Sequence, residues 1–325
     1  MKLSASRLAI AGRLTLLSAL VLAMTFTLLA VSPIDPMLYY TSDNLFAMSA
    51  EHTAQFSGTL GLDQPLATRF HQWGVNLMQG DLGFSISQQQ PVIEVLNQRV
   101  PLTLRLMVMG WLGSLLLGYS SGILAAIYQG RIVDRFIQGL SWVTASAPAF
   151  WIALLALSLF GVTLQWVPVC CGAPIGVSPN AMSWWQQMPY LIMPTLVLSL
   201  SGMSHVAMHT RERALQVLAS EHVLYARLQG KSGWGIYRYH LFRNTLTPAV
   251  VLQFAGLSEL LGGSALIETV FNFPGIGMTM VVAGLNGDIA LLMAITLLSM
   301  LLVFAGNALA RLISMKLLPE GRGHV

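Results

Sequence analysis

The tripeptide Gly230-Lys231-Ser232 has the residue types with which a phosphate-binding loop ends. Such a loop follows the pattern G-x-x-x-x-G-K-[ST], because its first glycine lets successive backbone N–H groups point at the phosphates of a nucleotide. Here Tyr225 stands where that first glycine belongs, and the residues before it have the pattern of a helix rather than of a buried strand. The tripeptide therefore predicts no nucleotide site, and its role depends on the elements around it.

The composition indicates a membrane protein. Only 9% of the 325 residues are charged and 55% are apolar, whereas roughly 25% of the residues of soluble domains are charged. Apolar stretches of about 20 residues, the length that a bilayer core requires, predict six transmembrane helices. They lie near residues 14–34, 106–130, 138–160, 190–208, 249–270 and 289–310. We therefore expect an all-α polytopic membrane protein.

Lys and Arg residues predict which side of the membrane each loop faces, because cytoplasmic flanks collect basic residues. Fourteen of the 17 lie in the N-terminal segment, the loops 128–137 and 209–248, and the C-terminal tail. Both termini are therefore expected in the cytoplasm. The basic residues are scattered among these flanks rather than gathered on one face. We therefore expect the chain to contact the lipid bilayer and to bind no nucleic acid.

This topology divides the chain into four parts. They are a cytoplasmic N-terminus with the first helix (1–31), an extracytoplasmic subdomain (32–102), a core with helices two to six (103–314) and a cytoplasmic tail (315–325). The subdomain holds six acidic residues, and it could either cover helix ends or dock an external partner. A cleaved signal peptide is an alternative for residues 1–32, but the apolar stretch is longer than usual and no clean A-x-A site follows it.

Cys170 and Cys171 are adjacent in a predicted external loop. We expect no bridge between them, because a disulfide between neighbours would be strained. Two cysteines alone are also too few for a structural metal site. We predict no metal site and no cofactor.

The loop at 209–248 has the pattern of a helix, a glycine corner and a second helix. Ser220 suits the N-cap of the first helix, and Gly230 ends it because glycine adopts the left-handed turn that other residues resist. Ser232 can cap the second helix, and Pro248 is expected to open the next span. Such a loop is either an amphipathic connector on the membrane surface or a protruding element that another protein binds.

The sequence EHVLYARLQGKSGWGIYRYHLFRNTLTP, residues 221–248, resembles the EAA loop of ATP-binding-cassette (ABC) importer permeases of the dipeptide, oligopeptide and nickel branch. The pattern of that branch is approximately A-R-x-x-G, then H-x-L-R-N-x-x-L-P. The matching residues here are Ala226, Arg227, Gly230, His240, Arg243, Asn244 and Pro248. The chain departs from the pattern at Leu224, Phe242 and Thr247, and these changes leave the corner glycine and the proline intact.

The resemblance covers nearly the whole chain. GLDQPL, GDLGFS, QPVIEVL and RVPLTLRL, between residues 61 and 106, are similar to the first external region of the family. SAPAFWIALL at 146–155 and ETVFNFPGIG at 268–277 are similar to its third and fifth spans. SELLGGSALIETVF at 258–271 is closer to nickel-type members than to peptide-type ones.

The resemblance implies the type I ABC importer permease fold, in the bacterial inner membrane, and no enzymatic activity. It implies a second homologous permease subunit, expected to form a heterodimer, two cytosolic ATPase subunits and an extracytoplasmic solute-binding protein. The short helix of the EAA loop would sit in a groove of an ATPase, whose closure tilts the membrane helices. Ala226 would let the ATPase approach closely, and Arg227 and Lys231 would meet carboxylates at the rim.

Glu259 and Glu268 lie in a predicted span, where a charged group is costly unless it faces a partner or an aqueous path. Both are candidates for the translocation path of a cationic solute. For Glu268 we favour the alternative that it lies near the outer interface, bonded to helix ends or to the turn FNFPGIG. For Glu259 the two alternatives stay open.

Two other classes of function fit the sequence less well. An intramembrane protease needs a serine activated by a histidine from elsewhere in the fold, but Ser204 and His205 are sequence neighbours, and His205 fits a polar contact between helices better. A secondary transporter or channel usually shows inverted repeats or broken helices in both halves, and neither is evident. The solute stays open among nickel, metal chelates, dipeptides and oligopeptides, because selection resides largely in the external binding protein.

Overall fold

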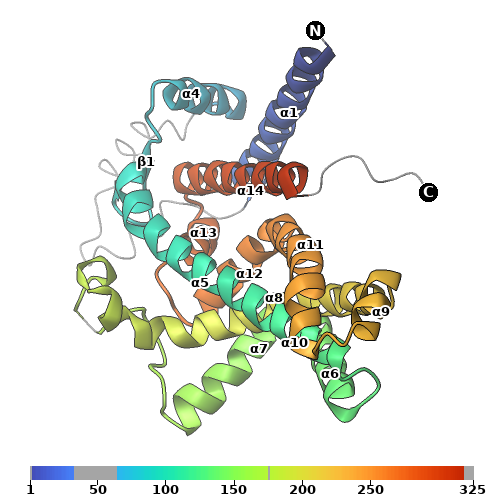
Figure 1. Cartoon of the computed structure of the whole chain (residues 1–325). Helices are drawn as coiled ribbons and strands as arrows, with labels where there is room; N and C mark the ends of the chain where they lie inside the picture. The colour runs from blue at the N-terminus through green and yellow to red at the C-terminus, as the bar shows by residue number, and fades with distance from the viewer. Residues whose placement is uncertain (1, 33–63, 175, 318–325) are drawn as a thin grey trace. The chain divides into compact units, whose positions relative to one another are not determined.

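The computed structural model describes residues 2–32, 64–174 and 176–317, without the side chains of residues 2–15, 316 and 317. Most of these residues are helical (Figure 1). Two compact units are formed, one by the chain up to Pro101 with Met278–Leu302, and the other by Leu102–Gly277 with the chain from Val303. Four of the six acids predicted in the extracytoplasmic subdomain, Asp35, Asp43, Glu51 and Asp63, lie outside the described residues, as does the tail after residue 317.

The first unit combines helices with a two-stranded antiparallel sheet. It contains α1 (Lys2–Val31), α4 (Leu66–Met78), β1 (Phe84–Ser85), β2 (Gln90–Pro91), the first part of α5 (Val92–Ile127) and most of α13 (Ile276–Leu285). Asp288, which is fully buried, caps α14 (Ile289–Leu317) by accepting a hydrogen bond from the backbone N–H of Leu291 at 3.1 Å. Its other oxygen accepts from the Ser85 hydroxyl at 2.6 Å. This carboxylate thus joins the sheet to the start of the last helix.

The second unit contains the remaining helices. They are α6 (Ile132–Ser146), α7 (Ala149–Ala156), η1 (Leu157–Thr163), η2 (Pro179–Ala181), α8 (Trp184–Leu218), α9 (Glu221–Leu228), α10 (Gly233–Ile236), η3 (Tyr237–Leu241), α11 (Phe242–Ala255) and α12 (Leu257–Val270). The long helix α8 is central, because it packs against α6, α7, α11 and α12. The remainder of α5 also packs on it.

Glycines let α5 and α8 approach closely. A Cβ atom at Gly118 would lie 2.7 Å from the Val206 Cβ, and one at Gly122 would lie 2.6 Å from the Ala207 carbonyl oxygen. Real Cβ atoms do not come so close to other atoms. The two helices can therefore lie this close together only because both positions are glycine. Small residues at helix contacts are typical of membrane proteins, in which packing rather than the hydrophobic effect drives helix association.

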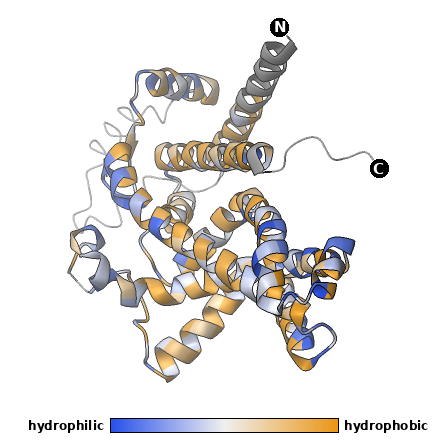
Figure 2. Ribbon diagram, in the orientation of Figure 1, coloured by the Kyte–Doolittle hydropathy of each residue, from blue (hydrophilic) through white to orange (hydrophobic). Residues whose placement is uncertain are grey.

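In the part of the chain that the structure describes, three helices are long and apolar enough to cross a membrane: α5, α8 and α14. Two bent pairs, α6 with α7 and η1, and the helix from Gly233 to Ala255 with α12, raise the number to five if each is counted as one span. The apolar segment Leu16–Val31 of α1 is shorter. Apolar residues cover much of α7 and α14, whereas polar residues gather around α9 (Figure 2). The count of six transmembrane helices therefore stays a prediction.

The span predicted at 138–160 is not straight. The α6 pair bends by 108° at the break between Ser146 and Ala149. Pro148 has no N–H to donate and restricts the residue before it to extended conformations. Ala147 accordingly has φ −81° and ψ 133°. The bend is thus a direct consequence of a proline that the hydropathy pattern ignores.

Our expectation for the adjacent cysteines is wrong, because Cys170 and Cys171 form a disulfide. Cys171 adopts a left-handed conformation, with φ 87°, and this unusual backbone lets two side chains on neighbouring residues meet. The Cys171 N–H donates to the carbonyl oxygen of Phe271 at 3.2 Å. The bridged turn therefore packs against the end of α12.

Candidate functional site

The loop at 209–248 has the predicted helix, corner and helix. The corner follows α9: Gly230 has φ +75° and its N–H donates to the Arg227 carbonyl oxygen at 2.9 Å. Ser232 Oγ accepts a hydrogen bond from the Gly235 N–H at 3.2 Å and so caps the second helix. The prediction for Gly230 and Ser232 is confirmed. Because Gly-Lys-Ser follows a helix here, its backbone lacks the strand context of a nucleotide-binding loop.

The beginning and the end of the loop differ from the prediction. The helix α8 continues to Leu218, so the first ten residues of the predicted loop extend that helix. At the other end, Pro248 lies inside α11 rather than at the start of a span. A proline inside a helix removes the N–H that would bond the carbonyl four residues earlier, here that of Asn244. The helix continues in spite of this loss, so our placement of Pro248 at a helix start is wrong.

The two faces of α9 differ sharply. Val223 is fully buried, in a cluster that also contains Ala214 and Val217 of α8, and Ala226 on the same face is only 2% exposed. The opposite face presents Leu224, Tyr225 and Leu228, which are 60%, 63% and 78% exposed. The role that we expected for Ala226, close approach to an ATPase, therefore does not fit its position. Its small side chain instead lets α9 pack on its own neighbours.

The other predicted loop residues do not form one cluster. Arg227, Lys231, Arg243 and Asn244 are exposed and His240 is half-buried. Lys231 lies over the Tyr239 ring with its Nζ 5.8 Å from the centroid, and Asn244 donates to the His240 carbonyl oxygen at 2.7 Å. The loop thus offers cationic side chains beside an exposed apolar face, and nothing in this set resembles a catalytic arrangement.

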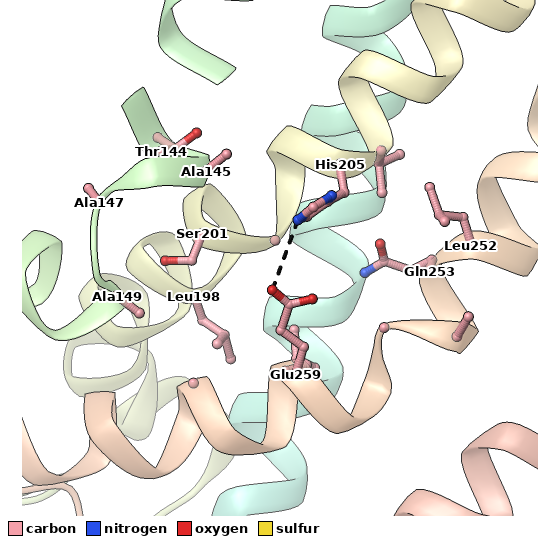
Figure 3. Close-up of a pocket in the computed structure, with 16 residues that line it drawn as sticks. Thr144, Ala145, Ala147, Ala149, Leu198, Ser201, His205, Leu252, Gln253 and Glu259 are labelled. Atoms are coloured by element: carbon pink, nitrogen blue, oxygen red, sulfur yellow. Dashed lines mark ion pairs between the residues drawn. The ribbon is translucent and has the colours of Figure 1, made fainter. Parts of the chain in front are cut away.

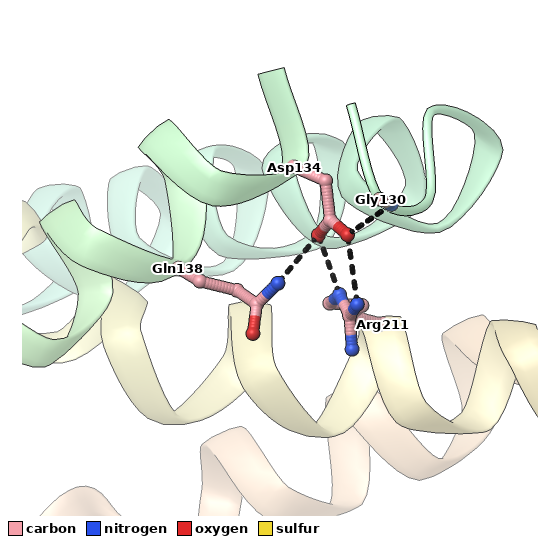
Figure 4. Close-up of polar contacts among 4 residues, drawn as sticks. All are labelled: Gly130, Asp134, Gln138 and Arg211. Atoms are coloured by element: carbon pink, nitrogen blue, oxygen red, sulfur yellow. Dashed lines mark hydrogen bonds and ion pairs between the residues drawn. The ribbon is translucent and has the colours of Figure 1, made fainter. Parts of the chain in front are cut away.

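An ion pair that sequence reasoning missed, in which Asp134 is buried and Arg211 is partly exposed, joins the segment predicted as the loop 209–248 to α6 (Figure 4). Arg211 of α8 donates from Nε to Asp134 Oδ1 at 2.7 Å and from a terminal nitrogen to Asp134 Oδ2 at 2.8 Å. Gly130 N–H and Gln138 Nε2 each donate to the same carboxylate at 2.8 Å. With four donors, the charge of Asp134 is well compensated. One indication of this pair was present in the sequence, because Asp134 is the only acidic residue between Glu94 and Glu212.

Glu259 lines a cavity of about 470 Å³ between α8, α11, α12 and the break at Ala147 (Figure 3). His205 of α8 points toward it, with Nε2 4.0 Å from Glu259 Oε1. Both side chains are largely exposed, at 54% and 77%. The pair therefore joins two helices across an open space rather than inside a packed core.

Glu268, nine residues further along α12, is fully buried. Its carboxylate accepts hydrogen bonds from Thr103 Oγ1 at 2.6 Å and from the Gly277 N–H at 2.7 Å. Thr103 Oγ1 in turn accepts from the Ile276 N–H at 2.8 Å. These contacts are those of the alternative that we favoured from the sequence, in which Glu268 bonds to the turn FNFPGIG.

Residues 118–318, which include the loop at 209–248 and the cavity, match the family described as "Binding-protein-dependent transport system inner membrane component". The chain belongs to this family. The permease is 32% identical over 290 residues to the "Putative peptide transport system permease protein" of Brucella abortus (strain 2308), which covers 89% of this chain and 90% of that one. It is 28% identical over 288 residues to the "Oligopeptide transport system permease protein" of Bacillus subtilis (strain 168), with 88% and 89% covered.

Membership settles the broad class of function. The permease is a membrane component of a transport system and not an enzyme, so the protease alternative is wrong. The family resemblance that the loop motif indicated is confirmed. These relatives are named for peptide transport, so the predicted nearness to nickel-type members stays a prediction.

Proposed function

We propose that the permease is one membrane subunit of an ABC importer for peptides and that the loop at 209–248 couples it to an ATPase. The observation that carries this proposal is the exposed apolar face of α9, formed by Leu224, Tyr225 and Leu228. A cluster of exposed apolar side chains on a short helix marks an interaction site. The names of the relatives favour peptides as the solute.

The structure of the loop suits the transmission of force. Val223 packs with Ala214 and Val217 at the end of α8, so a push on α9 reaches a helix that continues to Trp184. The Arg211 pair then links α8 to Asp134 at the start of α6. Closure of an ATPase dimer would therefore tilt α6 and α8 together as a rigid body.

The same ion pair supports the proposed topology. Asp134 of α6 lies in the segment predicted as the loop 128–137, and Arg211 of α8 lies in the segment predicted as the loop 209–248. A direct bond between the two segments favours their position on the same side of a membrane. Both loops are rich in basic residues, which favours the cytoplasm. In this arrangement the termini are cytoplasmic and residues 32–102 are external, where they meet a solute-binding protein.

A second permease subunit and a second ATPase complete the importer. The cavity at Glu259 lies on an exposed part of the second unit, so a second permease that faces it would close a path between the two subunits. We propose a heterodimer, with this path carrying the peptide. Glu259, rather than the fully bonded Glu268, is the charged group in α12 that such a path exposes.

The substitution Gly230→Leu tests the coupling function. A β-carbon in the left-handed region costs about 1–2 kcal/mol, so the corner changes its direction while the spans stay intact. We expect normal insertion, continued ATP hydrolysis and loss of most peptide uptake in proteoliposomes that contain all subunits. Gly230→Asn is expected to keep uptake, because asparagine tolerates this conformation.

The matched control is Gly80→Leu. Gly80 also has a positive φ, +83°, and open space around its Cβ position, but it lies outside the loop. Its substitution introduces the same strain without altering the corner. Coupled uptake in Gly230→Leu equal to that in Gly80→Leu would contradict the coupling function.

The alternative of a secondary transporter or channel makes a different prediction. Peptide uptake by the purified permease without an ATPase, driven by an ion gradient, would establish it. Uptake that requires added ATPase and ATP supports the importer. Replacing the peptide by labelled nickel in the same vesicles decides between the two solute classes.

A further inference from the structure

Polar residues form a stripe along one face of α8. Ser201, His205, His209, Glu212 and Gln216 recur every three or four residues, the spacing that places side chains on one face of a helix. The last four are exposed and Ser201 is partly exposed. Polar side chains in such a row favour contact with water or with a polar solute rather than with lipid.

Two neighbouring cavities follow this stripe. The first, of about 470 Å³, is lined by Ser201 and His205, and the second, of about 440 Å³, by His209, Glu212 and Gln216. Leu252 and Ala255 of α11 line both cavities. The stripe therefore connects two spaces along α8, each large enough for a small ligand.

The first cavity has the chemistry of a cation site. Its wall is largely small or apolar, and among the described residues that line it Glu259 is the only acid. His205 Nε2, at 4.0 Å, is beyond hydrogen-bond distance, so it orients the carboxylate without saturating it. Gln253 also lines the cavity, and its amide nitrogen donates a hydrogen bond to the Trp111 carbonyl oxygen at 3.0 Å. The Glu259 carboxylate is thus an acceptor in a space where His205 is the only basic side chain among the described lining residues.

We propose that Glu259 and His205 form a binding site for the protonated amino group of the transported peptide. This inference rests on the proposed function, because it places the site within the path. The carboxylate accepts one N–H of the ammonium, and a His205 ring nitrogen and the Ser201 hydroxyl accept the others. The rest of the peptide lies along the apolar wall and the continuing stripe.

A free metal ion fits this site less well. A divalent ion bound by protein side chains takes four or more ligands, and no group of three or more His, Cys, Asp or Glu residues that could hold a metal occurs in the described part of the chain. An ammonium needs only acceptors within reach. A cationic metal complex that brings its own ligands is the competing occupant, and the experiment distinguishes it.

The test uses the complete importer in proteoliposomes, with the binding protein saturated either with dialanine or with N-acetyl-dialanine. Glu259→Gln removes the charge and keeps the shape of the side chain. We expect uptake of dialanine to fall about tenfold, which corresponds to about 1.4 kcal/mol. Uptake of the acetylated peptide, which has no ammonium, should change less than twofold. His205→Gln should lower dialanine uptake by a smaller factor, because it retains one acceptor.

Glu94→Gln is the matched control, because Glu94 is an exposed carboxylate outside the cavity. It should leave both rates unchanged. Equal losses for the two peptides in Glu259→Gln, or no loss for either, would overturn the site. Loss of labelled nickel-complex uptake with normal dialanine uptake would do the same and would assign the cavity to a metal complex. ATP-dependent uptake by the unaltered importer, measured in the same vesicles, tests the proposed function separately.

Discussion

Two glutamates on one helix show how differently the same side chain is used. Glu259 and Glu268 lie nine residues apart on α12, yet one side chain is 77% exposed and the other residue is fully buried. Glu268 accepts hydrogen bonds from a threonine hydroxyl and a backbone N–H, whereas Glu259 faces a histidine at 4.0 Å across a cavity. Glu268 is surrounded by hydrogen-bond donors, as a structural acid is, whereas Glu259 faces an open space in which a solute can reach it.

The energetic reason is the cost of removing a charge from water. A buried carboxylate is tolerated when hydrogen bonds replace its hydration, and Glu268 has these bonds. The Glu259 carboxylate faces the open cavity and keeps its hydration, so it needs no hydrogen bonds from the protein in place of water. Consequently, loss of Glu268 should affect stability, and loss of Glu259 should affect transport.

Replacing each glutamate by alanine gives the largest expected difference. Glu268→Ala leaves the Gly277 N–H and the Thr103 hydroxyl without their acceptor, which we expect to lower the free energy of unfolding by about 3 kcal/mol. Glu259→Ala should change it by less than about 0.5 kcal/mol, as for other exposed positions. Thermal melting of the purified permease in detergent measures both. Equal destabilisation by the two variants would break the comparison.

A smaller effect is expected when the Glu268 site is crowded rather than emptied. A Cβ atom at Gly275 would overlap the Glu268 carboxylate and Thr103 Oγ1, and such overpacking costs about 1–3 kcal/mol. Gly275→Ala should therefore lower the melting temperature. Gly262→Ala, on the same helix as Glu259 but with open space around its Cβ position, should leave it unchanged or raise it slightly. A neutral Gly275→Ala would show that the turn adjusts freely.

Local features of the sequence predicted the loop well. Gly230 and Ser232 act through their own backbone, so a corner and a cap could be recognised without the rest of the fold. Pro148 was an equally local indication of the bend between Ser146 and Ala149, which hydropathy alone does not reveal. Pro248 misled us because the rule that places proline at helix starts does not hold where packing maintains the helix.

Features that depend on residues far apart could not be predicted. Asp134 and Arg211 are 77 residues apart, and only the packing of α6 on α8 brings them together. His205 and Glu259 meet for a similar reason, across α8 and α12. The burial of Ala226 also required the fold, because the apolar residues of α9 lie on both of its faces and the sequence alone did not show which face packs inward.

Binding of an ATPase to the exposed face of α9 can be measured by photo-cross-linking from residue 228. A photoreactive amino acid replaces Leu228, which is 78% exposed, or as a control Met78, which is 83% exposed and lies in the predicted extracytoplasmic subdomain. We expect an adduct with the ATPase subunit from position 228 and none from position 78. An adduct from position 78, or none from position 228 in an importer that transports peptide, would contradict this mode of binding.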